Sequence, residues 1–579
     1  MGFCCLFRYL ANMTTAPEDH RRRHGGRAAL LLALLAAGFI ALPVAVVTGH
    51  LFLPASDVSV HLFRTVLPGY VSNTLVLGLG VGVLTLVIGG GLAWLVTMHD
   101  FPGRSLFEWA LILPLAAPAY VLAYAYTDLL DISGPVQSGL RMLTGADAQT
   151  LAFPEIRSLG GAILVLSLAL YPYVYLTARA AFLQQCECIV EAARTLGAGP
   201  FTAFRRVALP MARPALAAGV ALALMETFAD YGAVAYFGVP TFTTGIYRAW
   251  YSFGDPVAAA RLASLLLGAI MLLMLLERMG RRHARYHDTS RRVRPLGIQR
   301  LSGGRALLAM LVCALPLMLG FLLPAAHLLA LALKSGATPS VRYLGLVSNS
   351  VLLASTTAIL ALMLAVPLAY IARSRKDRPT RLLIAISGIG YAIPGSIIAV
   401  GVLIPFAALD RRLAPLLEAL FGYHGGLVLT GSIAALVFAL LVRFLALALQ
   451  TSSAGLAKIT PSIDAAARSL GSTPMRLLLR VHAPLLKAPI FSALLLVFVE
   501  VIKELPATLI MRPFNFDTLA VAAHNLAADE RLAEAALPAL SIMACGLVPV
   551  WLLSRLIARA RPGHGARQNA PLPITATPV

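Results

Sequence analysis

The stretch EAARTLGAGPFTAFRRVALPMARP, Glu191 to Pro214, has a counterpart in AAARSLGSTPMRLLLRVHAPLLKAP, Ala465 to Pro489. Both stretches begin with an alanine-rich helical pattern, break at a glycine, and continue into a second segment that carries arginine. Both lie between long apolar runs, although their own composition is typical of a water-exposed helix-turn-helix. The question is why such an element occurs twice in one chain.

The same repeat extends well beyond these two stretches. The matching pairs are Ser72 and Ser348, and Pro118 and Pro394, at an offset of 276, followed by Gly197 and Gly471, Pro210 and Pro484, Glu226 and Glu500, and Asp230 and Glu504, at an offset of 274. A nearly constant offset over this length indicates that the chain consists of two copies of one unit.

The composition places these copies in a membrane. The chain has 579 residues, of which 59% are hydrophobic and 13% are charged, whereas soluble domains are about 45–50% apolar and about 25% charged. Apolar runs of about 20 residues predict membrane spans. The twelve candidates are 28–48, 70–97, 106–130, 159–182, 215–237, 258–279, 306–333, 349–372, 382–409, 427–450, 489–511 and 533–557.

The basic residues predict the orientation of the spans. Lys and Arg concentrate in alternate loops, as in Arg281–Arg300 and Arg373–Arg381, and such loops face the cytoplasm. We therefore expect both termini in the cytoplasm and read the net charge of +21 as a topology signal, with membrane lipid and not nucleic acid as the partner. Each copy has six spans, so the two copies are parallel repeats.

The sequence thus predicts an all-α polytopic membrane protein with about 12 transmembrane helices in two parallel six-helix repeats, each with a cytoplasmic helical loop. The predicted parts are a cytoplasmic N-terminal tail (1–27), a first six-span domain (28–279), a basic cytoplasmic linker (280–305), a second such domain (306–558) and a cytoplasmic C-terminal tail (559–579).

In the cytoplasmic loops, the second segment predicts a short amphipathic helix, which we expect Pro210 to end. Its apolar side carries Phe201 and Phe204 in the first copy, and Met475 and Leu478 in the second. An interfacial helix that caps the bundle would have this pattern. The repetition at fixed spacing favours a second interpretation, in which the apolar side fits a groove of a partner protein.

The first loop resembles the signature of permease subunits of ATP-binding-cassette importers of the type I fold, "EAA", three residues, Gly, and later "LP". The matching residues are Glu191, Ala192, Ala193, Gly197, Leu209 and Pro210. In that family this loop is the coupling helix, which docks into a cytoplasmic ATPase subunit. The resemblance implies that the loop, with Phe201 and Phe204, is one of two ATPase-coupling sites.

The second loop departs from the signature. Ala465 replaces Glu191, an acid stands one position earlier at Asp464, and Ala483 replaces Leu209. Asp464 either takes the place of the missing carboxylate or pairs with Arg468 four residues on. The candidate coupling residues of this loop are Asp464, Ala466, Gly471, Met475, Leu478 and Pro484.

The chain contains no G-x-x-x-x-G-K-[ST] pattern, so it cannot bind ATP by that device. The resemblance implies that ATP is used by a separate ATPase, present in two copies, and that a periplasmic binding protein delivers the substrate. We expect no cofactor and no enzymatic activity in this chain.

Acidic residues near mid-membrane are the candidates for the translocation path. Glu226 and Glu500 lie near the middle of their spans, and Asp230 and Glu504 are expected one turn later on the same helix face. Lys503 lies beside them. Carboxylate oxygens suit hard cations, although no metal site is firmly assigned. Pairing of Arg443 with Glu500 or Glu504 is the structural alternative.

Two further stretches look like fused two-domain ferric-iron permeases: ETFADYGAVAYFGVPTFTTGIYRAWY (Glu226–Tyr251) and EVIKELPATLIMRPFNFDTLAV (Glu500–Val521). This resemblance implies iron import across a bacterial inner membrane. Permeases for thiamine, polyamines or phosphonates share the architecture. A secondary transporter with two six-span halves is the main rival, and it would need neither coupling loops nor an ATPase.

Overall fold

The computed structural model describes residues 25–54, 56–145, 147, 150–151, 153–184, 202, 204–282, 299–336, 340–375, 377–422 and 427–559. Within these ranges the chain is almost entirely helical, and the one strand pair joins β1 (His99–Asp100) to β2 (Gln299–Arg300) in parallel. The predicted all-α class is confirmed.

The long helices of the first half are α2 (Gly25–Gly49), α4 (Leu67–Met98), α8 (Leu159–Gln184), α11 (Leu209–Ala229) and α14 (Pro256–Arg282). Those of the second half are α15 (Gly304–Leu317), α16 (Leu323–Lys334), α17 (Val341–Ser374), α20 (Ile433–Leu456), α24 (Lys487–Lys503) and α27 (Leu532–Arg559), with the π-turn η6 (Met318–Leu322) between α15 and α16. The shorter first-half elements are η2 (His50–Phe52), α3 (Asp57–Thr65), α13 (Phe242–Tyr247) and η5 (Arg248–Ser252), and α26 (Leu519–Ala528) belongs to the second half.

Nine helices of the described residues are long and apolar enough to cross a membrane, and twelve spans result when each of three bent pairs is one span. The predicted number of twelve agrees with the second count. The bent pairs join α5 (Arg104–Ala110) and η3 (Leu113–Ala116) to α6 (Ala119–Leu130), α18 (Arg378–Ser387) and η7 (Gly390–Ala392) to α19 (Gly395–Phe421), and η8 (Leu478–His482) and α23 (Ala483–Leu485) to α24.

The first two bends, of 91° and 113°, occur at Pro118 and Pro394, which are repeat equivalents. Each proline is the residue before the next helix and has extended backbone angles. Proline lacks an N–H and cannot continue a helix from the preceding residues without losing a hydrogen bond. The same residue therefore breaks the same span in both halves.

The predicted end of the loop helix at Pro210 was wrong. The π-turn η4 (Phe204–Ala208) runs directly into α11, so Pro210 does not end the helix. A proline in the first turn after such a wide turn removes no hydrogen bond that the helix needs. The π-turn η8 recurs at an offset of 274, so this irregularity is part of the repeat.

The predicted spans 215–237 and 489–511 are also not continuous helices. The first stops at Ala229 and is followed by the short helix α12 (Gly232–Tyr236). The second stops at Lys503 and is followed by α25 (Pro506–Met511). Both breaks lie at the same place in the repeat.

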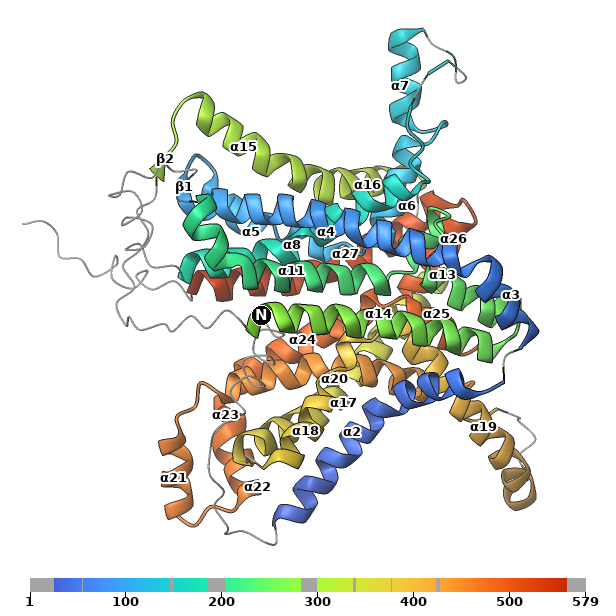
Figure 1. Cartoon of the computed structure of the whole chain (residues 1–579), viewed down its shortest axis with the longest axis vertical. Helices are drawn as coiled ribbons and strands as arrows, with labels where there is room; N and C mark the ends of the chain where they lie inside the picture. The colour runs from blue at the N-terminus through green and yellow to red at the C-terminus, as the bar shows by residue number, and fades with distance from the viewer. Residues whose placement is uncertain are drawn as a thin grey trace, which may run out of the picture.

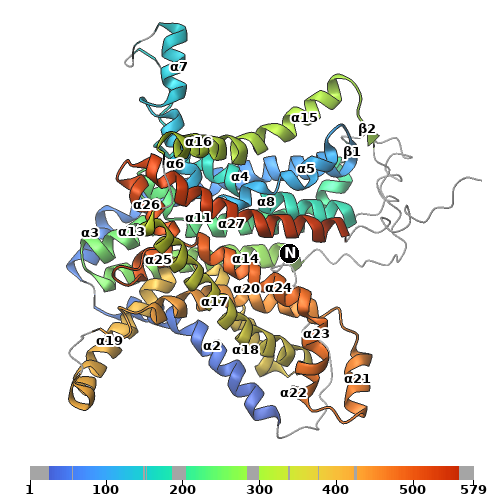
Figure 2. The ribbon, with the colours of Figure 1, turned by 180° about the vertical axis from the view of Figure 1, so that it is seen from behind.

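The first helix of each half packs largely on the other half. Helix α2 lies against α18 and α19, with a smaller contact to α14 (Figures 1 and 2). Conversely, α15 contacts α4 and α5, and η6 contacts α8 and η3. In the first contact, Gly401 of α19 packs directly on Pro43 of α2. This reciprocal exchange joins the halves outside their central interface.

The two ends of the bundle carry different elements. Helices α21 (Pro461–Ser469) and α22 (Pro474–Leu477), from the second of the two repeated loops, lie at one end (Figure 1). Helix α7 (Pro135–Thr144) and the C-terminal part of α19 project at the opposite end. The long helices run between these ends, as expected for membrane spans.

The contact between α2 and α19 predicts a specific loss of stability in Gly401→Ala. A Cβ atom there would lie 2.5 Å from the Pro43 carbonyl oxygen and 2.7 Å from the Pro43 Cα, so backbone must move, at a cost of about 1–3 kcal/mol. The change should lower the thermal midpoint of the purified protein in detergent. Gly268→Ala, on the exposed side of α14 with no atom within 4 Å, is the control and should leave the midpoint unchanged or raise it. Equal midpoints in the two variants would contradict the exchange contact.

Candidate functional site

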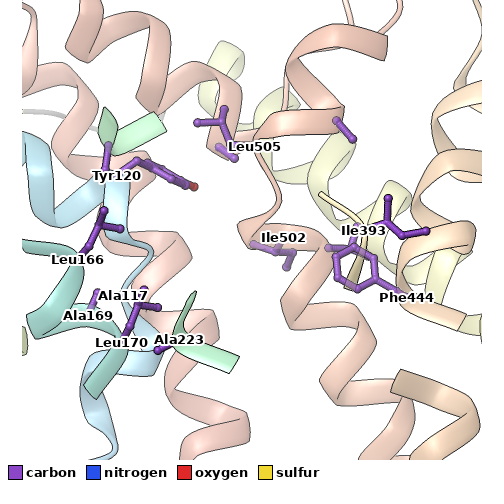
Figure 3. Packing of buried hydrophobic residues seen from close by; sticks show 14 of the residues in the cluster. Ala117, Tyr120, Leu166, Ala169, Leu170, Ala223, Ile393, Phe444, Ile502 and Leu505 are labelled. Carbon is purple, nitrogen blue, oxygen red and sulfur yellow. The ribbon is translucent and has the colours of Figure 1, made fainter. Parts of the chain in front are cut away.

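A cavity of about 120 Å³ lies where the two halves meet, and charged side chains form part of its wall. The charged lining residues are Glu226, Asp230, Arg443, Glu500, Lys503 and Glu504. The structure thus brings together all five residues that the sequence assigned to the translocation path, together with Arg443. Apolar side chains flank the site, with Leu166 and Leu170 on the first-half side and Phe444 and Leu505 on the other (Figure 3).

Two of the four carboxylates are engaged in the helix breaks. The Asp230 carboxylate accepts hydrogen bonds from the backbone N–H groups of Ala233 and Val234, at 3.0 and 3.2 Å. Glu504 does the same for Ala507 and Thr508, at 2.8 and 3.0 Å. These are repeat-equivalent caps for the first N–H groups of α12 and α25, which have no partner within their own helices.

Asp230 and Glu504 line the same cavity as Glu226 and Glu500, in keeping with the spacing of four residues. Both residues end their helices, α11 and α24. Their carboxylates turn towards the N-termini of the next helices, where charge and helix dipole attract each other.

The other two carboxylates remain turned towards the cavity. Glu500 Oε1 lies 2.7 Å from the Lys503 ammonium, which also lies 3.5 Å from the Leu115 carbonyl oxygen of the first half. Glu226 hydrogen-bonds Tyr391 and lies within electrostatic reach of Arg443. The site therefore contains two structural and two cavity-facing acids.

Arg443 is buried and pairs with Glu504, with Nη1 and Oε1 3.6 Å apart and side-chain exposures of 9% and 2%. This pairing was one of the structural alternatives from the sequence. Its Nε and Nη1 atoms have no hydrogen-bond partner among the described residues. Buried donors of this kind usually point to water or a bound group in the neighbouring space, which here is the charged cavity.

Sequence reasoning missed the tyrosines of the site. Tyr173 of α8 and Tyr391 of η7 hydrogen-bond each other, and the Tyr120 hydroxyl donates to the Lys503 carbonyl oxygen at 3.4 Å. The Tyr247 hydroxyl donates to the Pro506 carbonyl oxygen. Tyrosines are common in apolar spans, so only their positions across the two halves identify these.

In the second loop, Asp464 is buried in an internal network. Its Oδ2 lies 2.9 Å from Arg373 Nε, and its Oδ1 lies 3.0 Å from His482 Nε2 without hydrogen-bond geometry. Arg373 also donates to the carbonyl oxygens of Leu456 and Ile459. One guanidinium thus ties α21 to the ends of α17 and α20, and Asp464 pairs with Arg373 and not with Arg468.

The loop between α17 and α18 next to this network is also held by charge. Asp377 accepts hydrogen bonds from the Thr380 N–H and hydroxyl and pairs with Arg375 at 3.0 Å. Burial alone would raise the pKa of Asp377, but these hydrogen bonds and the Arg375 charge outweigh it and lower the pKa. The start of α18 is therefore fixed by an ionised cap at neutral pH.

The apolar surface of the second loop differs from the expected one. Leu478 is 8% exposed and packs inward, whereas Leu470 is 86% and Leu479 is 61% exposed. Leu478 lies next to the buried Leu477 and is therefore not on the exposed apolar side on which the sequence placed it. Ala466, Gly471 and Pro484 are exposed, and Gly471 has a φ of 77°, which suits glycine.

Much of the first loop lies outside the described residues, including Glu191, Ala192, Ala193, Gly197 and Phe201. Leu209 and Pro210 begin α11. Phe204 lies in η4 and Met475 in α22, but the placement of their side chains lies outside what the structure describes.

Comparison with known proteins decides the family. The profile of the binding-protein-dependent transport system inner membrane component matches residues 85–278 and again 361–562, well over half of the chain. The chain belongs to this family. The two matches correspond to the two halves of the repeat, so the protein is a fused, two-domain permease of the ATP-binding-cassette type.

Relatives of this permease differ in how much of the chain they cover. The Fe(3+)-transport system permease protein FbpB 2 of Haemophilus influenzae is 24% identical over 89% of this chain and 96% of its own length. The sulfate transport system permease protein CysT of Salmonella typhimurium is 30% identical over 34% of this chain and 72% of its own. The molybdenum transport system permease protein ModB of Escherichia coli is 29% identical over 34% of this chain and 85% of its own length.

The Asp464 network predicts that Asp464→Asn loosens the second loop. The change leaves the Arg373 charge without its carboxylate partner in a mostly buried position, which costs several kcal/mol in buried pairs. Trypsin should then cut at Arg468 and Arg476 faster, on the order of tenfold. The measurement is the initial cleavage rate of the native permease in detergent.

Glu534→Gln is the matched control for this experiment, because it breaks the Arg531–Glu534 pair, whose side chains are both 54% exposed. Exposed pairs contribute about 0–1 kcal/mol, so cleavage should not change. Equal cleavage rates in Asp464→Asn and the unmodified permease would show that the network does not hold the loop.

Proposed function

We propose that this permease is the membrane subunit of an ATP-driven importer that moves ferric iron from a periplasmic binding protein to the cytoplasm. The observation that carries the proposal is the charged cavity between the halves, in a chain that aligns with an Fe(3+)-transport permease over nearly its full length. The relatives named for sulfate and molybdenum align with about a third of the chain.

The donor chemistry of the cavity supports a hard cation. Glu226 and Glu500 present carboxylate oxygens, and Leu115 adds a backbone carbonyl oxygen next to Glu500. Oxygen donors of this kind suit hard metal ions, whereas soft metals prefer sulfur. The described residues contain no group of three or more His, Cys, Asp or Glu placed to hold a metal ion.

The size of the cavity favours an ion over an organic substrate. Pockets for small organic molecules have volumes of about 300–1,000 Å³, whereas this cavity has about 120 Å³ in the present conformation. Thiamine and polyamines would need a much larger opening at the same place. This argues against the organic substrates among the alternatives.

An oxyanion is the second candidate substrate. Arg443 and Lys503 line the same cavity, and two Arg443 nitrogens lack hydrogen-bond partners. Both basic groups, however, lie close to carboxylates, with Lys503 at 2.7 Å from Glu500 and Arg443 at 3.6 Å from Glu504. Four carboxylates against two cations give the lining a formal charge that repels anions, so we favour the cation.

The cytoplasmic loops support the ATP-driven mechanism. We propose that the loops around Glu191 and Gly471 dock two copies of a separate ATPase, because the element occurs once in each half. In the second loop, exposed Leu470 and Leu479 offer the apolar contact, and Asp464 transmits movement to α17 through Arg373. A secondary transporter would have no use for these loops. The distribution of basic loops supports a bacterial inner-membrane location with both termini in the cytoplasm.

The test of cargo is uptake by the double variant Glu226→Gln and Glu500→Gln in cells that express the complete transport system. Removing both cavity-facing carboxylates should reduce accumulation of radioactive iron at least tenfold, since each lost charge–charge contact contributes on the order of 1 kcal/mol or more. The amount of permease in the membrane is measured in parallel.

Glu418→Gln, at an exposed position near the end of α19, is the control and should transport iron normally. Normal iron uptake by the double variant at equal abundance would refute the assignment of the cavity to an iron path. Uptake of sulfate or molybdate in place of iron would support the second candidate.

A further inference from the structure

The two halves differ in two charges at the cavity. Arg443 matches Ala169 in the repeat, and Lys503, the last residue of α24, matches Ala229 in α11. The four carboxylates are paired, since Glu226 matches Glu500 and Asp230 matches Glu504. The amino group of Lys503 is therefore an addition to the second half alone, and a structural role common to both halves does not explain it.

The Lys503 ammonium lies among oxygen atoms from both halves. It is 2.7 Å from Glu500 Oε1 and 3.5 Å from the carbonyl oxygen of Leu115. Glu226 of the first half lies within its electrostatic reach. These are the oxygens that the proposed function assigns to a cation, so a positive charge of the protein already lies where the cargo would bind.

Lys503 can leave this position, whereas Arg443 cannot do so easily. A lysine side chain is a point charge on a flexible four-carbon stem, whereas the guanidinium is planar and rigid. The Lys503 side chain is 17% exposed and faces the cavity, whereas Arg443 is 9% exposed and pairs with the buried cap Glu504. Moving Arg443 would leave that carboxylate without its counter-charge.

The charged side chains in the cavity wall do not balance one another. Nε and Nη1 of Arg443 lack hydrogen-bond partners among the described residues, but they are donors that water can satisfy, so the guest is inferred from the charges alone. Four carboxylates and two basic groups share the space, so the lining keeps an excess of negative charge. A guest cation is the group that such a lining can accept, provided that one basic side chain withdraws.

We propose that Lys503 is a tethered substitute for the cargo cation: its ammonium holds the Glu500 and Leu115 oxygens until a metal ion displaces it, and its return helps to release the ion. The inference rests on the proposed cation transport. It explains how carboxylates can remain charged in a low-dielectric site before the ion arrives. It also keeps binding weak enough for the ion to leave, which a transport path requires.

The test measures cation affinity directly, with terbium(III) as the probe. Terbium(III) is a hard trivalent ion that prefers oxygen donors, and nearby tyrosines such as Tyr120 and Tyr173 in the cavity wall sensitise its luminescence. Titration of the purified full-length permease in lipid nanodiscs gives a Kd. Because Lys503→Gln removes a competing charge, the Kd should fall on the order of tenfold.

Three further variants make the result specific. Lys503→Arg keeps the charge on a side chain that withdraws less easily, so it should not lower the Kd and should leave it unchanged or raise it. Lys503→Gln combined with Glu500→Gln should lose the gain, because the freed carboxylate is the source of the added affinity. Lys487→Gln, at an exposed position of the same helix, is the matched control and should not change the Kd.

The outcomes separate the inference from the proposed function. If terbium(III) binds the unmodified permease and Lys503→Gln does not tighten binding, Lys503 is not a substitute for the cargo. A different outcome would be that terbium(III) does not bind, whereas radioactive sulfate binds and Lys503→Gln abolishes this binding. The cargo would then be an anion, and both proposals would fail. A size-exclusion profile and thermal midpoint for each variant exclude misfolding as the cause.

Discussion

The structure depends on one constraint: backbone N–H groups inside a membrane need hydrogen-bond partners. Helices α11 and α24 stop within the bundle, and α12 and α25 begin there, so their first N–H groups cannot reach water. Unsatisfied groups of this kind cost several kcal/mol each in hydrocarbon. Asp230 and Glu504 satisfy them from the same place in both halves. Glu504 places a negative charge inside the bundle, and Arg443 is its counter-ion. The cavity lies beside this ion pair.

The repeat provides a scaffold on which the two halves have diverged. The broken spans at Pro118 and Pro394, the π-turns η4 and η8, and the two carboxylate caps are common to both. Lys503 has no basic equivalent in the first half, and the Arg373–Asp464 pair ties down only the second loop. The shared features thus set the fold, whereas the unshared charges distinguish the roles of the halves.

Sequence reasoning predicted the repeat, the twelve spans and the charged residues of the cavity, because hydropathy and self-similarity are carried by neighbouring residues. It did not foresee that α11 and α24 end at these acids, so that Asp230 and Glu504 cap the next helices. It also placed Leu478 on the exposed apolar side of the loop, where the side chain is buried. Arg373 lies 91 residues from Asp464, and α2 and α15 pack on segments that are distant in the chain. Neither contact can be recognised from the pattern of neighbouring residues.

Two of the four carboxylates cap helices and two face the cavity. The most direct test of this division compares the thermal stability of Glu504→Ala with that of Glu500→Ala. Loss of the Glu504 cap should cost about 1 kcal/mol, and the Arg443 charge left behind should add about 3–5 kcal/mol. Loss of Glu500 should cost much less, since Lys503 can turn towards the cavity. A clearly lower midpoint for Glu504→Ala in the purified permease agrees with this account. A Glu500→Ala variant that is equally or more destabilised would contradict it.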